Sequence, residues 1–450
     1  MGKNLDANSP SAMTYSGERE FACRADRVFD GSRLRSGVAV VVKAGRISGL
    51  VPIAQVPPGT TVVSEPGCTI IPGLIDAHVH FARWQGPLYL AHGVTTIRDV
   101  GNQQAWILAR RAEWSDHPWP RIFCVGPMLD GPTVGWVDLG RGCADAESAV
   151  RAVVETASAG VDGIKLYDGL PPEWLSVMAA AAHDEGLHAS IHCGKSTVLQ
   201  AATAGVDEFH HLDGVVAEFW PDHPPGWLEV WGHPGCGSTV AKQKEVADKI
   251  ALSGMIATPT LTYWHSRSIS ALPGYPPPEE VALMPGKVNA WGKSWGTRPP
   301  DAAAADTWKR ALEAARAFTS LLIERDVPVL AGTDVPCERI SPGVSLWREM
   351  SLLADCGMSA EQALRAATSE TAKRLRLRNV GSLKQGSPAD LSFVRGDPTS
   401  GIPERPEVPI VVRSGQVHRR AELVSAARQE AEDFESEPLY VAFRRVAGLA

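Results

Sequence analysis

The sequence predicts an α/β fold: a (β/α)8 TIM barrel with a small β-sandwich domain that is built from both ends of the chain. Helical patterns alternate with short apolar patterns through the middle of the chain, and the letters AGVD pass from helix to strand twice, at 159–162 and 204–207. Short β-type runs separated by Gly and Pro occur near both ends, at 22–71 and 381–420. Repeated βα units predict parallel strands covered by helices, as in a barrel or a doubly wound sheet.

The same patterns predict the domain boundaries. We expect a polar, flexible leader over residues 1–20, because it contains no apolar segment of the kind that signal peptides need. The β-sandwich domain is expected over 21–71 and 380–450, with a C-terminal tail in its second part. The barrel is expected over 72–379.

Eight candidate strands favour the barrel over an open sheet. The helices between them carry end signals, such as Asp145 before and Gly160 after one apolar pattern. The segment 212–300 interrupts the alternation with Pro, Gly and six tryptophans, which predicts a long loop or cap near the strand ends. The predicted strands are 70–80, 94–101, 121–127, 162–167, 187–192, 206–212, 255–263 and 327–334.

Composition and charge limit the class of protein. The chain has 450 residues, of which 44% are hydrophobic and 21% charged, as in ordinary soluble proteins. The net charge of -7 argues against nucleic acid, and no apolar run is long enough to cross a bilayer. The eight cysteines form no CxxC pair, so we expect reduced thiols. We expect a cytoplasmic homo-oligomer that acts on a small molecule and binds neither nucleic acid nor membrane.

Residues able to bind a metal occur at the ends of several predicted strands. Side chains alternate along a strand, so His78 and His80 point the same way. Strand ends of a barrel meet at one mouth, which would add Lys165, His192 and Asp334 to these histidines. Each of them alone has an ordinary structural explanation, such as a helix cap for Asp334. Together, imidazoles and a carboxylate at one mouth suit Zn²⁺ or a similar ion.

The sixth predicted strand ends in two adjacent histidines, His210 and His211. Alternation allows only one of them to face the barrel interior, and it does not say which one. The other would then support the site from behind or point outward.

Several motifs, in order along the chain, resemble the amidohydrolase superfamily. They are GLIDAHVHF, GVTTIRDVG, GIKLY, SIHCG, EFHHLDG, LAGTDVP and the long segment from 359 to 391, and the resemblance covers roughly residues 22 to 420. Lysine on the fourth strand resembles the binuclear branch, which includes prolidase-like and Xaa-Arg dipeptidases. The resemblance also extends to bacterial phenylurea and molinate hydrolases.

The resemblance implies two divalent ions per subunit, with zinc preferred and cobalt, manganese or iron as alternatives. It implies that His78 and His80 bind one ion, that His192 and His211 bind the other, and that Lys165, as N6-carboxylysine, bridges them. Asp334 would complete the first site and act as the catalytic proton shuttle. The choice of His211 over His210 rests on this resemblance. A carboxylated lysine offers an anionic oxygen bridge where an ammonium would repel the ions.

The substrate contacts are predicted from position alone. Arg83 and Lys195 follow ligand motifs and could bind a carboxylate. Trp264, His265 and Trp347 are predicted to contact the substrate, the first of them as part of an aromatic-walled pocket. Trp347 replaces a histidine expected in relatives, and the loop GPMLDGPTVGW replaces a glycine-rich loop. The aromatic pocket would draw on the six tryptophans Trp220, Trp227, Trp231, Trp264, Trp291 and Trp295.

The predicted function is hydrolysis of a C–N bond in an amide, carbamate or urea through a metal-activated hydroxide. The preferred substrate is small and apolar or N-aryl. The alternative within this class is a dipeptidase of the Xaa-Pro or Xaa-Arg type, which needs a cation for the substrate carboxylate. The alternative from another class is a non-catalytic relative that keeps the barrel for binding or assembly.

Overall fold

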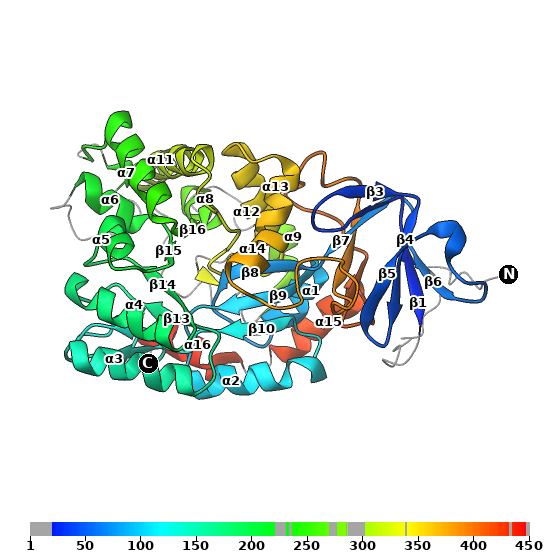
Figure 1. Ribbon diagram of the computed structural model, residues 1–450, viewed down its shortest axis with the longest axis horizontal. Coiled ribbons are helices and arrows are strands. Elements are labelled where there is room, and N and C mark those ends of the chain that lie inside the picture. Colours follow the sequence, from blue (N-terminus) through cyan, green and yellow to red (C-terminus); the bar gives the residue numbers. More distant parts are fainter. Residues whose placement is uncertain are drawn as a thin grey trace.

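The computed structural model describes residues 20–220, 231–233, 236–269, 277–284, 286, 302–337, 340–431 and 434–446. Figure 1 shows a TIM barrel with helices around it, and a smaller β module beside it. Of the predicted leader, only Glu20 lies within the described residues, so that prediction is outside what the structure describes.

Seven parallel strands of the barrel lie where the sequence predicts them. An additional short strand, β11 (Met128–Asp130), pairs with β13 and with β12 (Gly140–Gly142). The sequence did not predict these two strands. The seven strands are β8 (Leu74–Val79), β9 (Val94–Asp99), β10 (Arg121–Cys124), β13 (Gly163–Leu166), β14 (His188–His192), β15 (Glu208–His210) and β16 (Ile256–Thr258).

The eighth predicted strand closes the barrel by isolated bridges rather than by a regular ladder. Val329 bridges Ala257 of β16, and Val335 bridges Val79 of β8, both in parallel. Gly332 passes so close to β8 that a Cβ atom there would lie 2.7 Å from Cβ of His78. A glycine at this position therefore allows the closing segment to pack directly against a site residue.

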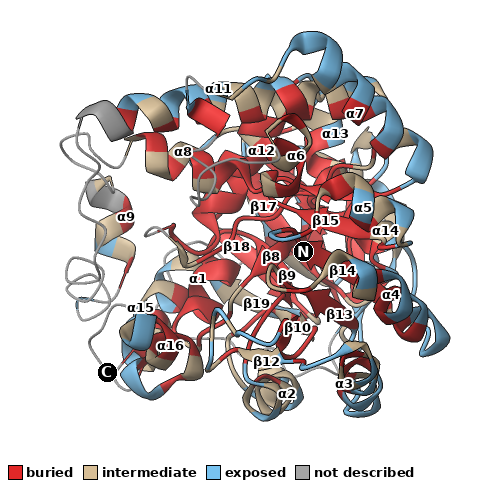
Figure 2. Cartoon of the chain, turned by 90° about the vertical axis from the view of Figure 1, so that its left-hand side faces the viewer, coloured by how far each residue is buried: buried red, intermediate tan, exposed pale blue. Residues whose placement is uncertain are grey.

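Helices surround the buried strands, with their exposed faces outward (Figure 2). The predicted cap is confirmed, because the Asp145 side chain accepts a hydrogen bond from Ser148 N at the start of α3. The helices are α1 (Gln85–Ala91), α2 (Gln104–Glu113), α3 (Ala146–Ser158), α4 (Leu175–Asp184), α5 (Val198–Thr203), α6 (Asp213–Phe219), α7 (Val240–Ser253), α8 (Leu261–Ile269), α9 (Pro278–Leu283), α11 (Ala302–Glu324), α12 (Val344–Asp355), α13 (Ala360–Ala366) and α14 (Ser369–Arg374).

The β module joins both ends of the chain. Its four-stranded sheet has the order β5-β4-β1-β6, and its six-stranded sheet has the order β19-β18-β17-β7-β2-β3. In the second sheet β17 pairs antiparallel with β7, so that Ser392 lies opposite Ile71. The strands are β1 (Phe21–Arg24), β2 (Arg27–Phe29), β3 (Leu34–Ser36), β4 (Val38–Lys43), β5 (Arg46–Pro52), β6 (Thr61–Ser64), β7 (Cys68–Pro72), β17 (Leu391–Arg395), β18 (Ile410–Arg413) and β19 (Gln416–Arg419).

The tail after the β module returns to the barrel. Helix α15 (Arg420–Glu430) packs on α1, and α16 (Pro438–Val446) follows it. Figure 1 shows both helices in red alongside the barrel. An apolar cluster joins them to the strand ends, so the last helix belongs structurally to the barrel mouth.

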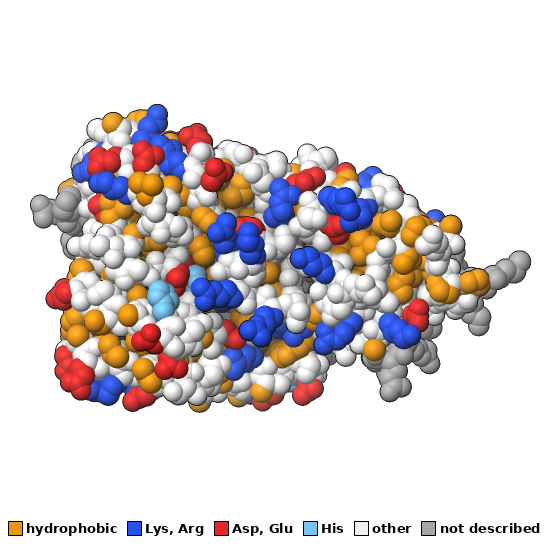
Figure 3. All heavy atoms as spheres, in the orientation of Figure 1, with side chains coloured by type: hydrophobic (Ala, Val, Ile, Leu, Met, Phe, Trp, Pro, Cys, Tyr) orange, Lys and Arg blue, Asp and Glu red, His pale blue; other side chains and the backbone are white. Residues whose placement is uncertain are grey.

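Two further properties of the molecule are the mixed charge of its surface and the state of its cysteines. On the face seen in Figure 3, basic and acidic side chains lie beside apolar ones across the barrel and the β module. All eight cysteines are free thiols. Among the described helices, none combines the length and the apolar character needed to span a bilayer.

Candidate active site

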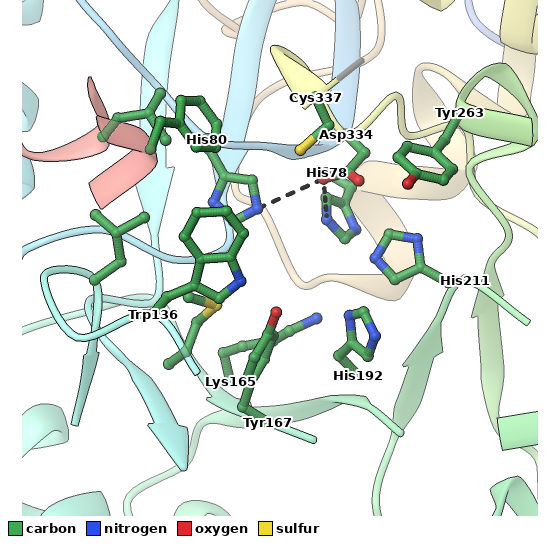
Figure 4. Close-up of a pocket in the computed structure, with 14 residues that line it drawn as sticks. His78, His80, Trp136, Lys165, Tyr167, His192, His211, Tyr263, Asp334 and Cys337 are labelled. Atoms are coloured by element: carbon green, nitrogen blue, oxygen red, sulfur yellow. Dashed lines mark ion pairs between the residues drawn. The ribbon is translucent and has the colours of Figure 1, made fainter. Parts of the chain in front are cut away.

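A cavity lies at the carboxyl ends of the barrel strands (Figure 4). Every predicted metal ligand contributes to its wall, and so does a set of apolar and aromatic side chains. Strand ends in a parallel barrel converge on one face, which explains why residues so distant in the sequence meet here. The lining residues are His78, His80, Met128, Trp136, Leu139, Lys165, Tyr167, His192, His211, Tyr263, Asp334, Cys337, Leu439 and Phe443.

His78, His80 and Asp334 form the tightest group of possible ligands. Oδ1 of Asp334 lies 3.2 Å from Nε2 of His78 and 3.5 Å from Nε2 of His80. One ligand atom from each of the three lies within 4.8 Å of the others. Figure 4 shows the three side chains pointing toward one another. This spacing suits three groups around one ion.

Hydrogen bonds orient the histidine rings toward the cavity. Nδ1 of His80 contacts the carbonyl of Gly101 at 2.8 Å, and Nδ1 of His211 contacts Oγ1 of Thr260 at 2.7 Å. In both rings the contact leaves Nε2 for an ion. Nε2 of His192 lies 2.7 Å from Oδ2 of Asp213, and the ring lines the cavity. Ligand histidines in metalloproteins are commonly oriented in this way.

Both histidines of the sixth strand lie inside the barrel. His210 follows Glu208 with the strand period and lies below the cavity, in contact with Lys165. His211 follows the end of β15 and has a φ of 59°, a left-handed conformation that departs from strand geometry and accompanies its place in the cavity wall. His211 thus lines the cavity and His210 supports Lys165 from behind, one of the two expected arrangements, and both rings lie inside the barrel because alternation ends where the strand ends.

A buried ionic network lies beneath the cavity. The Arg98 guanidinium donates to both oxygens of Glu208 at 2.7 Å. Glu208 also contacts His188 at 2.8 Å and His210 at 3.0 Å. Nδ1 of His210 then contacts Nζ of Lys165. The network thus connects a fixed ion pair to the lysine that lines the cavity.

Burial changes the protonation of the site. It lowers the pKa of His78, His80 and His211, so these rings are neutral and their lone pairs are available. Burial also lowers the pKa of Lys165 to about 7, and it raises the pKa of Asp334. Neutral imidazoles and a carboxylate are the donors that a divalent ion such as zinc binds, so the residues present fit a metal centre.

The structure places the two predicted carboxylate-binding residues outside the cavity wall. The side chain of Arg83 forms an ion pair with Glu437, with Nε 2.7 Å from Oε1. Lys195 is exposed and does not line the cavity. Their positions give no support to a substrate contact.

The three other predicted substrate contacts also lie away from the cavity wall. Trp264 is fully buried among aromatic core residues, and Trp347 is fully buried with its indole donating to the carbonyl of His92 at 2.9 Å. His265 is not among the lining residues. Of the six predicted pocket tryptophans, Trp227, Trp291 and Trp295 lie outside the described residues, and none of the described three lines the cavity.

Sequence reasoning did not find the residues that build the apolar wall. Tyr167 follows Lys165 by two positions, so strand alternation could have indicated it. Tyr263 is next to the predicted Trp264, and Trp136 ends the loop GPMLDGPTVGW. No local sequence pattern relates Phe443 to this site, because Phe443 lies far along the chain from the predicted ligands.

Comparisons with known proteins agree with this architecture. The sequence profile described as Amidohydrolase family matches residues 89–419. A bottromycin amidohydrolase structure has a TM-score of 0.72 at 20% identity, with 94% of this chain and 92% of that chain covered. A Xaa-Pro dipeptidase with bound methionine has a TM-score of 0.66 at 20% identity, with 89% and 100% covered. Molinate hydrolase has a TM-score of 0.64 at 17% identity, with 91% and 96% covered.

At these identities the solved structures show a common fold and do not identify a substrate. The sequence match is the stronger finding, because it covers more than half of the chain and runs from α1, just after the first barrel strand, into the β module. The chain therefore belongs to the amidohydrolase family, whose members are typically metal-dependent hydrolases that act on C–N bonds.

Proposed function

We propose that the protein hydrolyses the C–N bond of an amide, carbamate or urea in a small, uncharged, apolar or N-aryl substrate. The observation that carries the proposal is the composition of one cavity. Imidazoles, a lysine and a carboxylate meet on one side of it, and the rest of its described wall is aromatic or aliphatic, with Cys337. Hydrophobic walls with a few polar groups are typical of small-molecule sites.

The proposed metal ligands divide into two groups. His78, His80 and Asp334 would hold one divalent ion, and His192 and His211 would hold the second. Lys165, carboxylated on Nζ, would bridge them. When bound, the ions would activate water for attack and polarise the scissile carbonyl. Zinc is the first candidate, because neutral histidines dominate the set.

Lys165 is suited to the proposed modification. Its Nζ is buried and its pKa is lowered to about 7, so a large fraction of the amine is neutral near neutral pH. A neutral amine can attack the carbon of CO₂, form the N–C bond and release one proton to give the carbamate. The contact of Nζ with His210 Nδ1 would orient the nitrogen during and after this reaction.

Asp334 is the proposed proton shuttle. Asp334 is buried in the site, its carboxylate contacts two histidines, and burial raises its pKa above the ordinary value of 3.8. A carboxylate with a raised pKa accepts a proton from attacking water more readily and returns it to the leaving nitrogen. The C–N bond then breaks with a neutral amine as the leaving group.

The dipeptidase alternative receives less support. A substrate with a free carboxylate needs a cationic partner, commonly an arginine. Among the described lining residues there is no arginine, and the only lysine is Lys165. Prolidase and molinate hydrolase structures share the fold at similar identities, so fold likeness does not distinguish the two substrate classes.

The test combines metal content with a substrate panel. Elemental mass spectrometry of the purified protein is expected to give about two ions per chain, falling in Lys165→Ala. Lys195→Ala is the matched control, because Lys195 is exposed. One ion per chain, unchanged in Lys165→Ala, would overturn the bridged centre. Absence of metal even after reconstitution would favour the non-catalytic alternative.

The substrate panel compares anilides, aryl carbamates and aryl ureas with dipeptides. Turnover of the aryl compounds is expected. Turnover of dipeptides alone would overturn the proposed substrate class and favour the dipeptidase.

A further inference from the structure

The last helix of the chain forms part of the cavity wall, although it lies beyond the family match. The matched residues end at 419, whereas α16 spans Pro438–Val446. Leu439 and Phe443 of this helix line the cavity, one turn apart on the same face. Figure 4 shows this helix in faint red beside His80 and Trp136.

Two buried contacts attach α16 to the segment that follows the first barrel strand. Glu437 is 2% exposed and accepts hydrogen bonds from the backbone N–H of Arg83 at 3.1 Å and from its Nε at 2.7 Å. The indole of Trp84 donates to the Tyr440 hydroxyl at 2.9 Å, and both side chains are buried. Arg83 and Trp84 lie a few positions after His80, so α16 is fixed relative to the proposed ligands.

A third contact attaches α16 to the loop that carries Trp136. Nε of Arg445 lies 2.7 Å from Oδ2 of Asp138. The ring of Phe443 meets the ring of Trp136 edge to face, with 5.4 Å between the centroids. Trp136 packs against the apolar cluster that contains Tyr167, and both side chains line the cavity. Helix α16 and this loop therefore form one apolar wall of the cavity, on the side of His80.

We propose that α16 determines substrate specificity: Leu439 and Phe443, with Trp136, bind an uncharged aryl or alkyl group that lies next to the bond to be cleaved. This inference rests on the proposed function, since it names the substrate group that the same cavity accepts. A charged group in this position would lose its water without gaining a partner, because Arg83 is already paired with Glu437.

The experiment measures binding rather than turnover. Acetophenone and 2-acetonaphthone are neutral aryl ketones of two sizes, and neither contains a C–N bond to be hydrolysed. Their Kd values are measured by isothermal titration calorimetry with the metal-loaded protein and with Leu439→Ala, Phe443→Ala and Phe443→Leu. Val446→Ala is the control, because Val446 is on the same helix and is 57% exposed.

Removal of a buried phenyl contact is expected to weaken 2-acetonaphthone binding by about tenfold in Phe443→Ala. The loss is expected to be smaller in Phe443→Leu, which keeps an apolar contact, and Val446→Ala should stay within about twofold of the parent protein. Metal content and Tm are measured for each variant, and Phe443→Leu replaces Phe443→Ala if the latter does not fold.

Unchanged Kd values in folded, metal-loaded Leu439→Ala and Phe443 variants would overturn the inference. Failure of the parent protein to bind either ketone would overturn it as well. A third result would be ketone binding that depends on Phe443 in a protein that cleaves no compound of the substrate panel. That result would support the role of α16 in binding an aryl group and would contradict the proposed function. The two failures are therefore distinguishable.

Discussion

Arg98 and Glu208 form a bidentate ion pair inside the barrel, with both N–O distances at 2.7 Å. The side chain of Arg98 is 5% exposed and that of Glu208 is 0% exposed. Burial acts to raise the pKa of Glu208, but the positive charge of Arg98 and the contacts with His210 and His188 hold that pKa well below its ordinary value. The pair contacts His210, which in turn contacts Lys165, so the floor of the proposed metal site depends on this charge pair.

Glu208→Gln is expected to destabilise the protein strongly, because it leaves the Arg98 cation buried without a counter-charge. Loss of one partner of a buried pair costs about 3–5 kcal/mol. Urea denaturation followed by circular dichroism measures the change in the free energy of unfolding. Glu245→Gln is the control, since Glu245 pairs with Lys249 at an exposed site and its loss should cost far less than that of Glu208. Equal costs for the two variants would contradict the role of the pair.

Asp334→Asn is expected to lower kcat/KM by about 10²- to 10⁴-fold, the usual contribution of a positioned acid–base group. Asp334 has a φ of 65°, a conformation that asparagine tolerates, so folding should be preserved. Asp326→Asn is a matched control, because Asp326 is exposed and has a φ of 56°. Rates are measured with the best aryl substrate of the panel. Full activity of Asp334→Asn would remove Asp334 from the proton pathway.

Glu349 is expected to make stability depend on pH. It is fully buried and accepts hydrogen bonds from Leu261 N at 3.0 Å and Thr262 N at 2.7 Å, and burial raises its pKa from 4.5 to about 7. The folded state therefore binds the proton more tightly than the unfolded state. Stability from this group is complete below pH 4.5 and is lost as the pH rises through about 7.

The loss is expected to be on the order of 3 kcal/mol between about pH 4.5 and pH 7. Urea denaturation across this range measures it in the parent protein and in Glu349→Gln. The neutral glutamine cannot titrate, so its free energy of unfolding should change less with pH. A parallel pH dependence in both proteins would show that other groups are responsible.

Removal of metal is expected to lower Tm. A ligand that binds only the folded state stabilises it in proportion to the logarithm of its concentration over Kd. Differential scanning fluorimetry with and without a chelator measures the shift, and added zinc should restore Tm. The shift should be smaller in Lys165→Ala, which would lose one proposed ion. No shift in the parent protein would argue against tightly bound metal.

Glu437→Ala is expected to loosen α16 from the barrel mouth. The change removes the acceptor for both N–H groups of Arg83, and a broken buried hydrogen bond costs about 1–3 kcal/mol. Hydrogen exchange followed by mass spectrometry should show faster exchange over 438–446, while α3 stays unchanged as an internal control. Equal protection of α16 in both proteins would mean that its apolar face alone holds it in place.

Much of the side of the cavity that carries the proposed metal ligands could be predicted from the sequence. His78 and His80 share a face because side chains alternate along β8, and the strand ends of a barrel meet at one mouth. The helix that starts after Asp145 was predicted from its cap, which depends on neighbouring residues only. These features follow from local geometry.

The substrate side could not be predicted in this way. Trp264 and Trp347 are aromatic, as the residues of an apolar pocket often are. They lie on α8 and α12, where they are fully buried in the core and do not line the cavity. Arg83 follows the proposed ligand His80 closely in the sequence, yet it pairs with Glu437, 354 positions later in the chain. No local pattern encodes a contact over such a separation.

The sequence by itself determined the βα alternation, the barrel and the identity of the converging imidazoles, lysine and carboxylate, because strand and helix periods are short-range properties. Only the tertiary structure decided that His210 joins the buried ionic network and that His211 lines the cavity. The left-handed backbone at His211 comes after the end of β15, where side chains no longer alternate. The tertiary structure also decided which apolar side chains line the cavity, because Leu439 and Phe443 reach it through packing of a helix that is distant in the sequence.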